Sequence, residues 1–185
     1  MRRIWMKAAV VAVALMVASG CTYAFTDSGR VATCDQLVYE VNDHGLDPDG
    51  TMRAAIDAAF ARFGQAIGRP VRSLGSTAAS VTEHEPTDPV LVELAWPDDA
   101  PTALGYAEPA VIGSTYVSGW IRLNPVVAAA PSGLIRRLVL HEIGHLVGLA
   151  HVDASDELMD PDLPVDDYGW GDLYGLNVTH GGFCS

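Results

Sequence analysis

The stretch HEIGHLVGLAH, residues 141–151, decides the fold and the chemistry expected of this chain. It lies in an apolar segment that begins at Pro131-Ser132-Gly133, where Ser132 is a good N-cap, and its hydrophobic residues recur at helical spacing. On a helix, His141 and His145 lie one turn apart on the same face. Their imidazoles can therefore occupy two corners of a tetrahedral zinc site.

The rest of the stretch supplies the other parts of such a site. Glu142 projects beside the two histidines and can act next to a metal without binding it. Gly148 allows the chain to leave the helix sharply, because glycine adopts left-handed backbone angles without strain, and His151 can then turn back toward the same ion. Three neutral histidines leave one position open to water, which is typical of a catalytic zinc. Five fixed positions of this kind recur by chance about once in 10⁵ chains of this length.

This pattern, HExxHxxGxxH, resembles the zinc signature of the metzincin metallopeptidases, and the chain is most similar to their matrixin-like branch of small bacterial secreted members. Leu158-Met159-Asp160-Pro161 resembles the methionine turn of that family, and Asp166, Gly169 and Leu173-Tyr174-Gly175 resemble its C-terminal helix. The resemblance covers most of residues 34–184. It implies an α+β metzincin catalytic domain: a twisted mixed β-sheet with an edge strand for substrate, a long zinc-binding helix, the Met-turn and a C-terminal helix.

The resemblance also implies roles for single residues. His141, His145 and His151 would bind one Zn²⁺, Glu142 would be the general base, and Met159 would form an apolar floor beneath the metal. Val152 and Asp160 depart from the residues usual in vertebrate matrixins, which leaves the subfamily open. The structural zinc of the family is not expected, because Tyr106 stands at a strand position where a histidine would be needed.

The N-terminus has the features of a secretory signal peptide. Arg2, Arg3 and Lys7 precede an apolar run from Ala8 to Val17, which is too short for a membrane span, and residues 1–20 therefore form a signal peptide. Ala18-Ser19-Gly20-Cys21 looks like a bacterial lipoprotein box, in which Cys21 becomes the lipidated first residue. The expected location is outside the cytoplasmic membrane, anchored by lipid; the alternative is ordinary cleavage nearby and secretion.

If Cys21 carries lipid, Cys34 and Cys184 remain, near opposite ends of the exported chain. A disulfide between them would close a loop of roughly 150 residues and stabilise the domain by about 4 to 5 kcal/mol in the chain-entropy model. Two alternatives stay open: both thiols are unpaired, or the Cys34 thiolate binds and inhibits the metal.

Residues 21–33 have no sustained periodicity and are expected to form a tether, with the folded domain spanning residues 34–185. Residues 37–41 predict a strand, and residues 52–67 predict an amphipathic helix that Gly68 and Pro70 end. Three to five short strands are expected between residues 71 and 124, and a short helix around Trp170 to Leu176. A peptide substrate would pair with an exposed strand edge within Ala110–Ser118.

Composition limits the function further. The chain has 185 residues, a net charge of −12 and 49% apolar residues, which fits one globular domain that we expect to be monomeric. Removing residues 1–20 takes away three basic residues and no acidic one, so the exported charge is −15. Such a chain is a poor partner for nucleic acid. We also expect Trp96, Trp120 and Trp170 in the core, and His44 and His180 on the surface.

The leading hypothesis is a zinc-dependent endopeptidase anchored outside the cytoplasmic membrane, with a protein or peptide substrate. The main alternative is a catalytically silent zinc-binding lipoprotein of the same fold that acts as a binding module; Glu142 argues against it. A third is a zinc hydrolase of narrower scope that cuts one peptide or a cell-wall amide. The carboxylate-rich tail, residues 153–172, is of the type that binds Ca²⁺. It lacks EF-hand spacing, however, and fits better with a solvated acidic surface.

Overall fold

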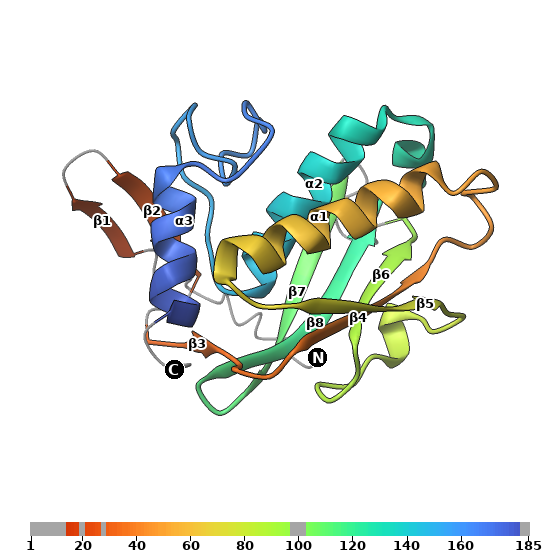
Figure 1. Cartoon of the computed structure of the whole chain (residues 1–185), viewed down its shortest axis with the longest axis horizontal. Coiled ribbons are helices and arrows are strands. Elements are labelled where there is room, and N and C mark those ends of the chain that lie inside the picture. The colour runs from red at the N-terminus through yellow and green to blue at the C-terminus, as the bar shows by residue number, and fades with distance from the viewer. Residues whose placement is uncertain (1–13, 19–20, 27–28, 97–102, 182–185) are drawn as a thin grey trace, which may run out of the picture.

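The computed structural model describes residues 14–18, 21–26, 29–96 and 103–181. In these ranges a six-stranded mixed β-sheet is combined with three α-helices. Figure 1 shows α1 (Thr51–Ile67) and α2 (Ser132–Leu146) together on one side of the sheet, and α3 (Trp170–Leu176) beside the end of α1. The predicted combination of a mixed β-sheet with helices is confirmed.

The sheet has the order β3-β8-β6-β4-β5, with β7 added alongside β8. All pairs are parallel except β7 with β8, which form an antiparallel hairpin. Parallel neighbours need long crossovers, and α1 supplies one between β4 and β5. The strands are β3 (Val31–Ala32), β4 (Leu37–Asn42), β5 (Val71–Ser76), β6 (Val90–Leu94), β7 (Gly105–Ile112) and β8 (Thr115–Leu123).

Among the described strands, the free edge next to α2 belongs to β7, which pairs with β8 along its whole length. β8 itself has β7 on one side and both β3 and β6 on the other, so it lies inside the sheet. The predicted edge, Ala110–Ser118, was therefore partly wrong: it runs through the hairpin turn into an interior strand. Pro109 fits an edge position, because proline cannot donate to a second neighbouring strand.

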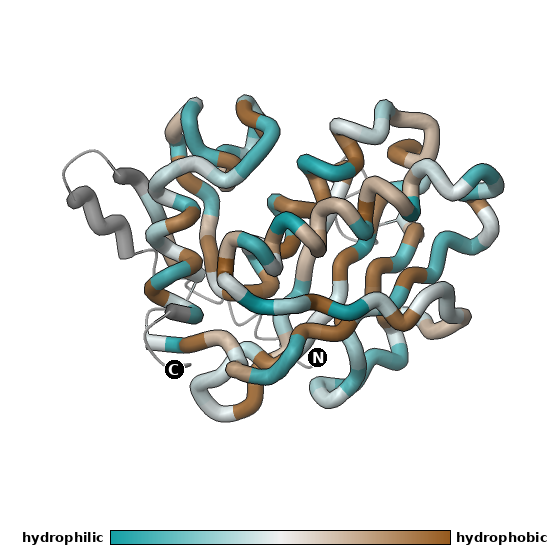
Figure 2. The backbone as a smooth tube through the Cα atoms, viewed as in Figure 1, coloured by the Kyte–Doolittle hydropathy of each residue, from teal (hydrophilic) through white to brown (hydrophobic). Residues whose placement is uncertain are grey.

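The core lies between the sheet and the two long helices. α1 buries Ile56, Phe60 and Phe63 at helical spacing, and the Phe60 ring stacks on Tyr39 of β4 with a centroid distance of 3.8 Å. Figure 2 shows hydrophobic residues recurring along the strands that face these helices. The helix ends as predicted at Gly68, whose φ of 69° is in the left-handed region.

α2 starts at Ser132, but the N-cap residue is Pro131 and no side chain caps the helix. The amides of Leu134 and Ile135 instead donate to the Pro131 carbonyl oxygen. Ser132 as N-cap was thus wrong by one residue. The position fits proline, which supplies a carbonyl and has no N–H to lose.

The predicted tether is partly packed against the domain. β2 (Cys21–Phe25) forms a hairpin with β1 (Ala14–Ala18), which lies within the predicted signal peptide. Tyr23 and Ala24 are buried, the Ala150 amide donates to Ala24, and the Thr26 amide donates to Gly148. The chain just after Cys21 is therefore held against the segment that follows α2.

Some predicted features lie outside the described residues: most of the signal peptide, and Cys184. The pairing of Cys34 with Cys184 stays a prediction. Among the helices in the described ranges, none combines the length and the hydropathy needed to cross a membrane.

Two predictions about burial were wrong. Trp170 and Trp96 are exposed, with 76% and 58% of their surface accessible: Trp170 is the first residue of α3, and Trp96 lies two residues beyond the end of β6. His180 is buried instead of exposed: its ring packs edge-on against Phe63, with centroids 5.7 Å apart. His44 is exposed as predicted.

Candidate metal centre

α2 carries three of the predicted site residues on its last two turns. His141, Glu142 and His145 lie on this helix, and His141 and Glu142 are 4% and 5% exposed. The helix packs between α1 and the hairpin β7–β8, so its buried faces are held from both sides. The two histidines therefore start from a rigid element.

The turn after α2 brings the third histidine back. Gly148 has a φ of 94°, its amide donates to the His145 carbonyl, and the Leu149 amide donates to Gly144. A Cβ at Gly148 would lie 2.6 Å from the ring of Tyr116. Glycine is required here twice, once for the backbone angle and once for the close approach to Tyr116.

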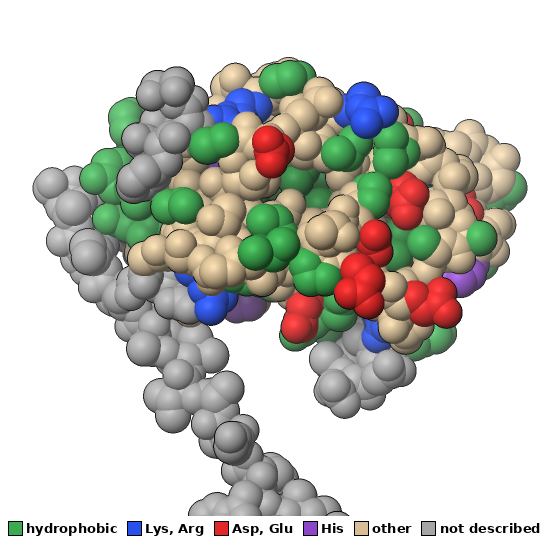
Figure 3. Space-filling view, turned by 90° about the horizontal axis from the view of Figure 1, so that it is seen from below, with side chains coloured by type: hydrophobic (Ala, Val, Ile, Leu, Met, Phe, Trp, Pro, Cys, Tyr) green, Lys and Arg blue, Asp and Glu red, His purple; other side chains and the backbone are tan. Residues whose placement is uncertain are grey.

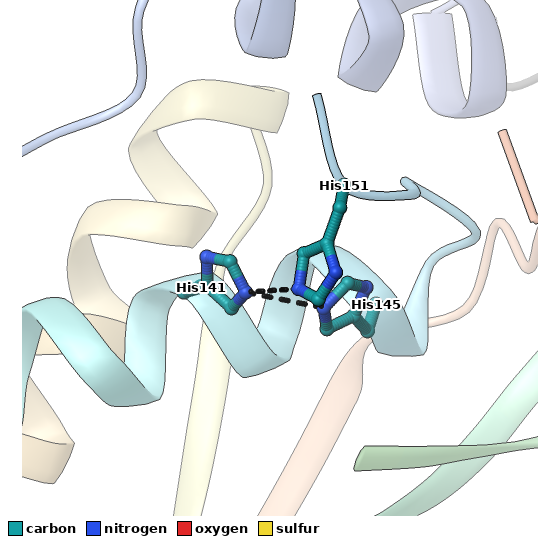
Figure 4. A group of neighbouring side chains, drawn as sticks. All are labelled: His141, His145 and His151. Atoms are coloured by element: carbon teal, nitrogen blue, oxygen red, sulfur yellow. Dashed lines mark hydrogen bonds between the residues drawn. The ribbon is translucent and has the colours of Figure 1, made fainter. Parts of the chain in front are cut away.

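The three imidazoles converge on one point. Each pair of Nε2 atoms among His141, His145 and His151 is 3.1 Å apart. Figure 4 shows the rings directed toward one another, two from α2 and one from the following loop. A tetrahedral zinc ion with Zn–N distances of 2.0–2.1 Å needs ligand nitrogens about 3.3–3.4 Å apart. In the described part of the chain, this trio is the group suited to hold a metal ion.

Hydrogen bonds fix the tautomers of two ligands. His141 Nδ1 lies 2.7 Å from the carbonyl oxygen of Leu158, and His145 Nδ1 lies 2.8 Å from that of Leu149. A carbonyl only accepts, so both Nδ1 atoms carry the proton and both Nε2 atoms present lone pairs. Two such Nε2 atoms cannot hydrogen-bond to each other. The residues present therefore fit one Zn²⁺ ion at the point they share.

Burial keeps the ligands neutral. It lowers the pKa of His141 to about 4 and that of His145 to about 3, mainly because the protonated rings would lose solvation. The pKa of His151 is lowered as well, for the same leading reason, although this side chain is more exposed. Neutral imidazole is the form that binds a metal, so the site is prepared for an ion at neutral pH.

Glu142 is buried beside the metal ligands. Burial raises the pKa of its carboxyl to about 8. Its side chain lies against Gly105, the first residue of β7: a Cβ there would be 2.6 Å from Oε1. A divalent cation nearby would favour the charged form of this carboxyl. The carboxylate of Glu142 thus lies between α2 and Gly105, the first residue of the edge strand β7.

Met159 packs under α2 as a buried side chain. A Cβ at Gly144 would be 2.5 Å from its sulfur, so only glycine at that position leaves room for the thioether. Its carbonyl oxygen accepts from the Val152 amide at 3.1 Å, and Asp160 accepts from the Ala154 amide at 3.1 Å. The loop containing Met159 therefore holds the segment that carries His151.

Two buried carboxylates join this loop to α3. Glu157 accepts from the amides of Gly171 and Asp172, and Asp172 accepts in return from the amides of Leu158 and Gly169. Burial is the main cause that raises the pKa of Asp172, to about 6. We call this pair of carboxylates the brace. It reaches the metal centre, because Asp172 accepts from the Leu158 amide and the Leu158 carbonyl accepts from His141.

The acidic tail is therefore only partly a solvated surface. Asp153, Asp156, Asp162 and Asp166 are exposed, whereas Glu157, Asp160 and Asp172 are buried and bonded to backbone amides. Elsewhere, Figure 3 shows Asp and Glu side chains gathered on the right-hand half of the face seen from below. Calcium binding by the tail stays a prediction.

Sequence reasoning missed four residues of the site. Gly105 and Gly144 make room for Glu142 and Met159, and Glu157 and Asp172 form the brace. Glycine within a helix was an available signal for Gly144, because helix interiors disfavour it unless packing requires it. The remaining three depend on contacts between distant segments.

No family model matches the chain, and no curated protein matches it. Among solved structures, it is similar to metalloproteinase-II from Bacteroides fragilis, with 15% sequence identity and a TM-score of 0.49. The match covers 81% of this chain and 54% of that one, so this chain spans about half the length of its neighbour. At this similarity, the neighbour's name describes the neighbour alone.

Proposed function

We propose that the chain is a zinc-dependent endopeptidase of the matrixin-like metzincin type. The observation that carries this proposal is the convergence of three neutral histidines, with Nε2 atoms 3.1 Å apart, next to a buried carboxylate at a free strand edge. His141, His145 and His151 would hold one Zn²⁺, which leaves a position for water and for the substrate carbonyl.

The chemistry of the site follows from its parts. When bound, zinc lowers the pKa of water toward 7 and polarises the scissile carbonyl. Glu142 takes a proton from the attacking water and later delivers it to the leaving amine. Its buried position strengthens both transfers, because few water molecules compete for the carboxylate. The brace from Glu157 and Asp172 keeps the Leu158 carbonyl in place as the acceptor for His141.

β7 offers backbone groups to a peptide substrate. The Asn124 amide donates to Leu104, which makes this an inward-bonded pair of the β7–β8 ladder. Such pairs alternate in an antiparallel ladder, so the backbone groups of Gly105 and Ala107 face the free edge. An extended peptide would bind there as an added strand, next to Glu142.

The proposal includes the place where the enzyme acts. The signal-like residues 1–20 and the lipoprotein-like box ending at Cys21 support export and lipid anchoring outside the cytoplasmic membrane. A disulfide between Cys34 and Cys184 would suit that compartment.

Substitution of the base tests the proposal. Glu142→Ala should lower peptide cleavage by at least about 10²- to 10⁴-fold while the protein still binds one zinc ion, because general acid–base catalysis contributes that much. The matched control is Asp153→Ala, which removes an exposed carboxylate from the loop after His151 and should retain full activity. Unchanged turnover in the Glu142 variant would reject Glu142 as the base. A zinc-bound wild-type protein with no turnover would favour the binding-module alternative.

A further inference from the structure

α3 presents large apolar side chains to solvent. Trp170 is 76% exposed, Tyr174 is 45% exposed, and Val178, in the π-turn that follows, is 41% exposed. These three residues are spaced four apart along α3 and the π-helical turn that follows it, and they are called the aromatic face below. The opposite side of α3 buries Gly171, Asp172, Gly175 and Leu176.

The segment that carries the aromatic face has no exposed charged side chain of its own. Tyr168–Gly181 contains one acidic residue and no Lys or Arg, in a chain of net charge −12. That residue is Asp172, which is 1% exposed and bonded to backbone amides. The segment's histidine, His180, is 5% exposed, and burial lowers its pKa to about 4. In an acidic protein, this segment thus exposes a tryptophan and a tyrosine without an exposed charge of its own.

The N-terminal strand reaches the domain beside this surface. The ring of Tyr23 in β2 lies 5.0 Å from the ring of Tyr174, and Tyr23 and Phe25 both lie next to Gly175. Figure 1 shows β2 and α3 side by side at the same end of the molecule. Cys21, the proposed lipid-bearing residue, precedes Tyr23 by two positions. A lipid on Cys21 would therefore hold this end of the domain close to the bilayer, because only two positions separate Cys21 from the packed residue Tyr23.

We propose that Trp170, Tyr174 and Val178 insert into the headgroup region of the phospholipid bilayer that anchors the chain. This inference rests on the lipid anchor of the proposed function. Tryptophan and tyrosine favour that region because their rings are apolar at one end and polar at the other, and stable anchoring generally requires a second signal besides a lipid chain. The acidic domain gains nothing from an anionic surface, so the apolar insertion carries the contact and does not weaken at high salt.

The test uses the mature acylated protein reconstituted into phosphatidylcholine vesicles whose acyl chains carry bromine near the headgroup. Bromine quenches tryptophan fluorescence only at short range, and the exported chain contains Trp96, Trp120 and Trp170. We expect quenching in the wild type, at least a threefold loss of it in Trp170→Phe, and its retention in Trp96→Phe. Trp96 is the matched control because it is also exposed.

The outcomes separate the anchor from the insertion. If the wild type floats with the vesicles and the Cys21→Ala variant does not, the anchor is supported. Quenching that depends on Trp170 then supports insertion. Flotation without Trp170-dependent quenching overturns the insertion and leaves the anchor standing, as does quenching lost equally in both tryptophan variants. A wild-type protein that does not float removes the anchor, and the insertion with it.

Discussion

Gly105 limits where the carboxylate of Glu142 can lie. A methyl group at this position would approach Oε1 to 2.6 Å and Cδ to 3.0 Å, so the whole end of the side chain would have to move. We predict that Gly105→Ala lowers kcat of peptide cleavage by about 10²-fold, since a displacement of 1 Å costs that much in positioned catalysis. Zinc content, measured by elemental analysis, should not change.

Gly133→Ala is the matched control for this prediction. A Cβ at Gly133 meets no atom within 4 Å, so the variant should keep its activity and gain a little helix stability. Equal activities for Gly105→Ala and wild type would show that the carboxylate of Glu142 does not need its present position.

Single residues were predictable where one local pattern specified them. The spacing of His141, His145 and Gly148 predicts their geometry from helix periodicity and backbone freedom alone, and the structure brings the three histidines together. Trp170 and His180 could not be placed in this way. The apolar or ionisable character of a side chain indicates which environments it tolerates. Its exposure depends on which segments of the chain pack over it.

At the scale of elements, β2 supports the loop that carries His151. Backbone bonds from Thr26 to Gly148 and from Ala150 to Ala24 join the two segments, and Thr26 Oγ1 lies 3.1 Å from the hydroxyl of Tyr116. The chain from Tyr23 to Thr26 therefore acts as part of the folded domain, whereas a free tether would make no such contacts.

Two truncations test this role of β2. A chain that starts at Asp27 should unfold at lower denaturant concentration than one that starts at Tyr23, with a loss of about 2–4 kcal/mol from the lost burial of Tyr23 and Ala24 and the lost backbone bonds. Its zinc affinity, measured by competition with a chelator, should also fall. The same midpoint and zinc affinity for both chains would mean that these residues are only a tether.

Elements with strong periodicity were predictable, and their partners were not. α1, α2 and α3 lie within a residue or two of the expected ranges, because helix patterns and stop residues such as Gly68 are local. The edge position of β7 follows from which strands pair, and the β6–β8 and β3–β8 pairs join residues far apart in sequence. The local alternation of apolar and polar residues does not specify this order of strands in the sheet.

At the scale of the whole molecule, burial of His180 links stability to pH. The pKa of this histidine is about 4 in the folded state against an ordinary value of 6.5, so the unfolded chain binds the extra proton first. The stability that neutral His180 contributes to the folded state is therefore fully present above about pH 6.5 and is lost as pH falls toward 4. The loss in the free energy of unfolding is on the order of 3 kcal/mol. The buried rings of His141 and His145 act in the same direction.

The variant His180→Gln isolates this effect. Its free energy of unfolding should decline less steeply than that of the wild type between pH 6.5 and 4, as measured by denaturant titration at each pH. Parallel curves for the two proteins would show that protonation of His180 does not contribute to acid unfolding.

The central claim, that this molecule hydrolyses peptide bonds with zinc, is tested most directly by digestion of a diverse peptide library. Zinc-loaded protein is incubated with the library, and the products are read by mass spectrometry beside a sample in which a chelator has removed the metal. The account predicts internal cleavages in the zinc-loaded sample that the chelated sample lacks. An intact library in both samples, from folded protein shown to carry one zinc ion, would contradict it.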